Sequence, residues 1–110
     1  MPSKPQPIFP SEQKILNNLG ERIKLARLRR GISAGALAER SSISRMTLHR
    51  AEKGFPAVAI GTYLRILAAL QLQDDLNLLA KDDALGRRLQ DLELSQPRKK
   101  RVNLELKKQS

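Results

Sequence analysis

The segment from residue 33 to residue 54, SAGALAERSSISRMTLHRAEKG, constrains the fold of this chain more than any other part of its sequence. Ser33 and Ser44 are each followed by helix-forming residues and are suited to cap a helix through the side-chain oxygen. Ser41 and Ser42 separate the two segments, and Gly54 ends the second one. Helices this short are not stable alone in water, so they must pack together and against other helices.

The apolar residues of this segment predict how its two helices cross. Ala38 is small enough to lie where the helices approach each other, and Leu37, Ile43, Leu48 and Ala51 recur at the spacing of one buried face. The remaining side chains of the second helix, which runs from about Ser44 to Lys53, then face outward. The segment therefore predicts a helix-turn-helix with a polar outer face.

Apolar periodicity predicts further helices on both sides of this segment. The first begins at Glu12 with Ser11 as its cap and ends at Gly31, although Gly20 leaves two shorter helices as an alternative. Its inward positions are Leu16, Leu19, Ile23 and Ala26. A fourth helix follows a loop at residues 55–59, with Ile60, Leu64, Leu67 and Leu70 as its apolar face.

Two short helices are expected after residue 72. Asp74 or Asp75 is expected to cap the fifth, which carries Leu76 and Leu79, and Asp82 or Asp83 to cap the sixth. The sixth helix carries Leu85, Leu89 and Leu92.

Composition supports an all-α fold of five to six helices. Aromatic residues make up only 3% of the 110 residues, so the core must consist of aliphatic side chains. The predicted organisation is a flexible, proline-rich leader at residues 1–10, a helical domain at 11–94 and a basic tail at 95–110. With no cysteine, no long apolar run and no export signal, a cytoplasmic protein without a membrane segment is expected.

Positive charge is concentrated in two stretches of the chain. The net charge of +10 favours polyanionic partners. Residues 19–53 contain nine basic and three acidic side chains, and residues 95–110 contain six and one, whereas residues 54–94 are slightly acidic. The first basic stretch includes the predicted helix-turn-helix, so its outer face is a candidate DNA-binding surface.

The segment 33–54 resembles the helix-turn-helix of Cro and the phage repressors, the Xre family, and the likeness extends over about residues 19–79. The resemblance implies a lambda-repressor-like domain whose third helix lies in the major groove of DNA. It also implies base contacts by Arg45, Met46 and Arg50. By the same resemblance, Arg27 and Glu52 form an ion pair that holds the recognition helix, the alternative being two separately solvated side chains.

Two positions depart from the pattern of that family. Ala34 stands where the family often has a glutamine that touches phosphate or adenine, so this contact is lost or moved. Ser42 stands where glycine usually adopts a left-handed backbone conformation, at some conformational cost.

A further resemblance, to antitoxin repressors of the HipB type, rests on GTYLRILAALQL at residues 61–72 and DDLNLLAKDDALGRRLQDL at residues 74–92. It implies a homodimer that binds its own operator and associates with a HipA-like kinase toxin.

The predicted DNA-binding residues surround the outer face of the third helix. They are Ser44, Arg45, Met46, Thr47, His49, Arg50 and Lys53. The arginines suit guanine, and Met46 suits either a thymine methyl group or a surface gap. Thr47 is expected at phosphate rather than at a base. His49 is either a phosphate or base contact or a plain exposed imidazole.

The tail carries the cluster Arg98, Lys99, Lys100 and Arg101, which is interpreted as a DNA-contacting arm. Alternatives are a strand formed by residues 102–106 that pairs in a dimer or with a toxin, and a tail without a defined role. No cofactor, metal site or enzymatic activity is expected, because the chain has one histidine, no cysteine and no glycine-rich phosphate loop.

The sequence thus predicts a sequence-specific repressor at double-stranded operator DNA in the cytoplasm, associated with the nucleoid, as the autoregulating antitoxin of a toxin-antitoxin module. Three alternatives remain. They are a phage-type repressor without a toxin, an interaction protein that neutralises an enzyme, and a non-specific polyanion binder that acts through its tail.

Overall fold

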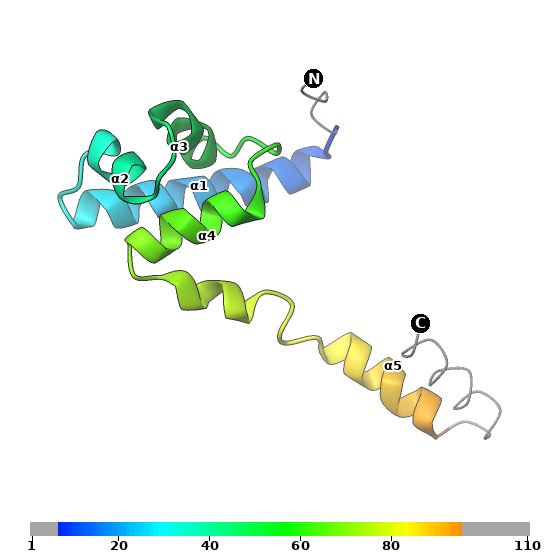
Figure 1. Cartoon of the computed structure of the whole chain (residues 1–110). Helices are drawn as coiled ribbons and strands as arrows, with labels where there is room; N and C mark the ends of the chain where they lie inside the picture. The colour runs from blue at the N-terminus through cyan, green and yellow to red at the C-terminus, as the bar shows by residue number, and fades with distance from the viewer. Residues whose placement is uncertain (1–6, 96–110) are drawn as a thin grey trace. The chain divides into compact units, whose positions relative to one another are not determined.

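The computed structural model describes residues 7–95, and all regular structure in this range is helical. The helices are α1 (Pro10–Arg29), α2 (Ala34–Arg40), α3 (Arg45–Glu52), α4 (Ile60–Ala69) and α5 (Ala84–Leu94), with a 3-10 helix, η1, at Gln73–Leu78. Figure 1 shows α2 and α3 together along one side of the long α1, and α4 along another. The prediction of an all-α fold is confirmed. No helix between residues 7 and 95 is both long and apolar enough to span a bilayer.

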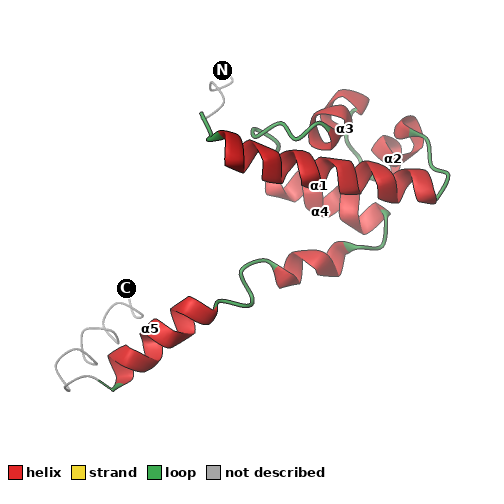
Figure 2. Ribbon diagram, turned by 180° about the vertical axis from the view of Figure 1, so that it is seen from behind, coloured by secondary structure: helices red, strands yellow, loops and turns green. Residues whose placement is uncertain are grey.

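The chain divides into two compact units, which are described separately. The first extends to Asn77 and contains α1 to α4, and the second begins at Leu78 and contains α5. Figure 2 shows α1 to α4 of the first unit joined by turns and loops.

Helix α1 is a single helix that begins two residues earlier than predicted. Its first residue is Pro10, whose fixed φ and missing N–H suit the first turn. The cap position is Phe9, whose backbone N–H donates to Glu12 Oε1 at 2.9 Å. The prediction that Ser11 caps this helix is wrong, because Ser11 already lies inside the first turn.

Gly20 does not divide α1, because its lack of a side chain serves helix packing. A Cβ atom at this position would lie 2.5 Å from the carbonyl oxygen of Glu52 and 2.6 Å from that of Ala51. The backbones of α1 and α3 therefore approach each other here at a distance that only glycine permits. The alternative of two shorter helices is wrong.

The helix-turn-helix forms with the predicted caps. Ser33 accepts a hydrogen bond from the Ala36 N–H, and Ser44 accepts one from the Thr47 N–H. Between the helices, Ser42 has a φ of 57°, the left-handed conformation expected at this turn. The Ile43 N–H donates to the Ala38 carbonyl at 3.0 Å and closes the turn.

The core is aliphatic, with one tyrosine. It comprises Ile23, Ala26, Leu37, Ala38, Leu48, Ala51, Tyr63, Ile66, Leu67 and Leu70. Burial raises the pKa of the Tyr63 phenol. The predicted inner face of α4 is partly wrong, because Ile60 and Leu64 are 65% and 45% exposed. Apolar residues occupy more than one side of α4, so periodicity alone does not show which side is buried.

The segments after α4 follow the prediction only in part. Asp74 and Asp75 lie within the first turn of η1 and do not precede it, so their predicted role as its cap is wrong. Leu76 packs against the core, whereas Leu79 is exposed. Of the two predicted caps of this last helix, Asp83 is the one that caps α5, and its carboxylate accepts a hydrogen bond from the Gly86 N–H at 2.9 Å.

Candidate nucleic-acid interface

The outer face of α3 is rich in cationic and polar side chains. The structure places Arg45, Met46, His49, Arg50 and Lys53 in exposed positions on or directly after this helix. The opposite face is buried in the core through Leu48 and Ala51. Helix α3 therefore has one face committed to the fold and one face available to a ligand.

The amino end of α3 is fixed by its own side chains. Ser44 caps the helix, and its hydroxyl also donates to Thr47 Oγ1 at 2.9 Å. Thr47 is half-buried, unlike the longer side chains around it. Ser44 and Thr47 thus hold the first turn in place beside the exposed Arg45, at the end of the helix where partial positive charge favours an anion.

Arg45 lies across the beginning of α2. A methyl group on Gly35 would collide with the Arg45 guanidinium, so the small residue leaves room for this side chain. Sequence reasoning identified Arg45 but gave no role to Gly35. The only signal for it was a glycine in the first turn of a short helix, where it lowers helix propensity without an evident benefit.

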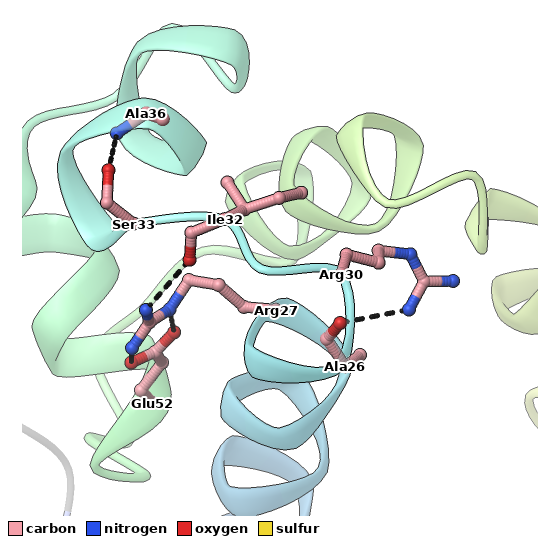
Figure 3. Close-up of polar contacts among 7 residues, drawn as sticks. All are labelled: Ala26, Arg27, Arg30, Ile32, Ser33, Ala36 and Glu52. Carbon is pink, nitrogen blue, oxygen red and sulfur yellow. Dashed lines mark hydrogen bonds and ion pairs between the residues drawn. The ribbon is translucent and has the colours of Figure 1, made fainter.

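Behind α3, Arg27 and Glu52 form a buried ion pair. Arg27 Nε lies 2.8 Å from Glu52 Oε2, and its Nη2 donates to Glu52 Oε1 at 3.2 Å. The two side chains are only 10% and 9% exposed. In Figure 3 the guanidinium fits between the Glu52 carboxylate and the backbone carbonyl of Ile32, which accepts at 3.1 Å. The structure thus brings together the two residues that the family resemblance paired.

This pair stabilises α3 against the end of α1, and both of its side chains also line the groove between α1, the start of α2 and α3. The hydrogen bond with Glu52 raises the pKa of Arg27, desolvation opposes this shift, and the charge of Glu52 adds to it. Figure 3 shows Arg30 turned the other way, toward the carbonyl of Ala26. The bonds of Arg27 to Glu52 and to the Ile32 carbonyl make it a positioning residue for α3.

A groove of about 480 Å³ lies between α1, the start of α2 and α3. Its lining includes Arg45, His49 and Lys53, together with Asn17 and Lys24 from α1. Neither residue of α1 was predicted at the interface. Their spacing of seven places them on one side of α1, but a polar stripe is also what any solvated helix shows.

A second link between α1 and α3 lies at the carboxyl end of α3. The Gln13 side-chain amide donates to the Gly54 carbonyl at 2.7 Å. Gly54 is buried and has a φ of 80°. The chain therefore leaves α3 in a fixed direction beside α1.

The predicted tail contacts Arg98, Lys99, Lys100 and Arg101, and the alternative strand at residues 102–106, lie outside the described residues. Between residues 7 and 95, no group of three or more His, Cys, Asp or Glu side chains is arranged to hold a metal ion.

The helices α2 and α3 form a helix-turn-helix, and the outer face of α3 is rich in basic side chains. This arrangement is typical of DNA-binding proteins. The model of the family described as helix-turn-helix domain matches residues 18–79, more than half of the chain. The chain therefore belongs to this helix-turn-helix family, whose members are DNA-binding regulators and typically not enzymes. A comparison with curated proteins gives no match.

Proposed function

We propose that the protein is a sequence-specific transcriptional repressor that inserts α3 into the major groove of operator DNA. One observation carries this proposal. The inner face of α3 is fixed by the core and by Glu52, whereas Arg45 and Arg50 on its outer face are exposed. Rigid placement of arginines at a groove is what bidentate recognition of guanine requires.

Charge supports the same orientation. The basic excess of residues 19–53 includes Lys24, Arg45, Arg50 and Lys53, which lie on or beside α3. Phosphate contacts by Lys24 and Lys53 would flank the base contacts of α3. His49 and Met46 complete the proposed surface, and Ser44 and Thr47 contribute hydroxyl groups at its amino end.

The experiment that tests this function replaces Arg45. Operator sequences are first selected from random duplexes with the full chain, and affinities are then measured by fluorescence anisotropy. Arg45→Ala is expected to cost about 1 to 3 kcal/mol in binding free energy and to relax selectivity at one base pair. A matched control is Arg65→Ala, because Arg65 is exposed on α4. Equal operator affinity and selectivity in both variants would remove Arg45 from the interface.

A homodimer on a palindromic operator is part of the proposal. Two copies related by two-fold symmetry would present their α3 helices to half-sites about 34 Å apart. Selected sequences should therefore contain inverted repeats with this spacing. Affinity should fall steeply with salt, because phosphate contacts release counterions. The tail cluster Arg98–Arg101 is proposed to add such contacts, so a chain cut at Pro97 should bind more weakly but prefer the same sequence.

The finer proposal is that this repressor is the antitoxin of a HipA-like kinase and controls its own operon. It rests on the resemblance of residues 61–72 and 74–92 to HipB-type antitoxins. A neighbouring gene for such a kinase, and its co-purification with this protein from the native host, are the expected findings. A kinase-free operon with a functional operator would instead favour a phage-type repressor.

A function as an interaction protein is favoured by one observation, the exposed leucines of α5. In that case DNA binding would be weak and unselective, while a partner enzyme would bind tightly. Measurement of selectivity over random DNA separates the two functions.

A further inference from the structure

Helix α5 carries a row of exposed leucines. Leu85, Leu89 and Leu92 are 67%, 56% and 56% exposed. Their spacing of four and then three residues places them on one side of the helix. An isolated helix of 11 residues is only marginally stable in water. Helix α5 is therefore expected to be stable only when another surface covers its leucines.

We propose that this row is a dimer seam, on which α5 packs in parallel against α5 of a second copy of this chain. The inference rests on the proposed function, because it supplies the dimer that a palindromic operator requires. In heptad terms Leu85 and Leu92 occupy d positions and Leu89 the a position between them. Leucine at d is typical of parallel helix pairs.

Charge on both sides of the seam favours a second copy in the parallel direction. Arg88 and Glu93 flank the leucines at g and at the following e position. These are the positions that form ion pairs across a parallel two-stranded coiled coil, so each Arg88 would meet Glu93 of the second copy, twice per dimer. Reversal of one helix would instead bring like charges together.

The other sides of α5 suit a solvated surface. Arg87 pairs with Asp82 at 2.9 Å, and both side chains are well exposed. Asp91 is also exposed. Leu94 lies nearly opposite Leu89 around the helix, as expected from five residues at about 100° each. It is also an exposed leucine, so it provides a matched control within the same helix.

The length of the seam predicts a weak dimer. At 1.5 Å per residue, α5 spans about 16 Å, roughly one and a half heptads. The free protein should therefore exchange between monomer and dimer in a concentration-dependent way. Two half-sites on one duplex hold two copies at high effective concentration, so the seam should appear mainly as cooperativity on the operator.

The first test compares Leu89→Asp with Leu94→Asp in the full chain. Sedimentation equilibrium over a range of concentrations gives the dimer dissociation constant. Leu89→Asp is expected to raise it about tenfold or more, because it places a carboxylate in the seam, while Leu94→Asp leaves it near wild type. Thermal unfolding of the unit that contains α1 to α4 should be the same in both variants.

The second test uses the absence of cysteine from the chain. In a parallel pair each d residue faces its own copy, so Leu92→Cys should form an intermolecular disulfide under mild oxidation. Leu94→Cys should not, because its side chain points away from the seam. Equal cross-linking of the two variants would overturn the parallel pairing.

Operator binding separates failure of this inference from failure of the proposed function. Leu89→Asp should bind a single half-site like wild type but lose cooperativity between two half-sites. Cooperativity and a dimer constant unchanged in Leu89→Asp would overturn the seam, and so would a wild-type chain that is monomeric in solution and non-cooperative on DNA. If Arg45→Ala loses selectivity, the proposed repressor function is supported whether or not α5 forms the dimer seam.

Discussion

Helices α3 and α5 are similar in length but differ in what holds them. Helix α3 is fixed on its inner side by Leu48 and Ala51 in the core and by the ion pair of Glu52. Helix α5 has a good cap at Asp83, but its leucines are exposed. A cap sets where a helix begins, whereas only packing makes it stable.

The difference also separates two kinds of exposed side chain. The exposed residues of α3 include two arginines, which suit a polyanion, whereas those that form the row on α5 are leucines and suit an apolar surface. We therefore assign DNA to α3 and a protein surface to α5. Substitutions that weaken the contacts between α3 and the rest of the fold test whether α3 must be held in place to bind DNA.

The largest effect on the stability of the fold is expected from Glu52→Gln. The amide keeps the shape of the side chain but removes the charge that balances Arg27, which remains buried with its guanidinium charged. We expect a loss of about 3 kcal/mol in the free energy of unfolding, measured by urea denaturation. An arginine guanidinium stays protonated at both pH 7 and pH 9, with or without Glu52, so this loss should be the same at the two pH values.

Glu39→Gln is the control for this substitution, because Glu39 is exposed on α2. It should change the stability by less than about 0.5 kcal/mol. Similar losses in the two variants would mean that the ion pair does not hold α3. Dimerisation through α5 should persist in folded Glu52→Gln protein, since the seam does not include α3.

A smaller loss is expected from Gly20→Ala. The added methyl group would collide with the backbone carbonyls of Ala51 and Glu52, so α3 must shift away from α1. Alanine favours a helix by about 1 kcal/mol over glycine, and overpacking costs about 1 to 3 kcal/mol. We expect a net loss of up to about 2 kcal/mol by thermal unfolding, together with weaker operator binding.

Gly61→Ala is the matched control, because Gly61 lies in α4 with no atom within 4 Å of an added Cβ. There the helix preference of alanine acts alone and should raise the stability. A gain at both positions would show that the close approach of α1 and α3 is not essential.

Local signals in the sequence predicted much of this fold. Ser33, Ser44 and Asp83 were recognised as caps because a helix cap depends on a few neighbouring residues. The crossing residue Ala38 followed from the apolar pattern. The start of α1 was missed because Ser11 and Pro10 are both acceptable near a helix start, and the choice depends on Glu12 bonding to the backbone of Phe9.

Features that depend on two distant segments were not predictable from local pattern. The role of Gly20 depends on the backbone of α3, and the exposure of Leu64 depends on which side of α4 meets the core. Arg27 and Glu52 were paired only through the family resemblance. Lys24 at the groove had no signal of its own, because a lysine on a polar helix face is common.

The smallest effect on stability is expected from a substitution in the turn that precedes α3. Ser42 has a φ of 57°, which costs a residue with a side chain about 1 kcal/mol, whereas glycine adopts this conformation freely. The added freedom of glycine in the unfolded chain offsets part of this gain. Ser42→Gly should therefore raise the stability by about 0.5 kcal/mol, or a few degrees in Tm.

Ser41→Gly is the contrasting substitution, because Ser41 caps α2 in an ordinary right-handed conformation and is buried. Glycine should destabilise the protein there, because it adds unfolded-state freedom, leaves a cavity and relieves no backbone strain. We expect these costs to exceed the gain from removing a buried hydroxyl that has no hydrogen-bond partner. A gain in stability at Ser42 and a loss at Ser41 would show that the backbone conformation of each serine, and not the serine side chain itself, decides the effect of glycine in this turn. A loss of stability at both positions would mean that the left-handed conformation of Ser42 is not strained.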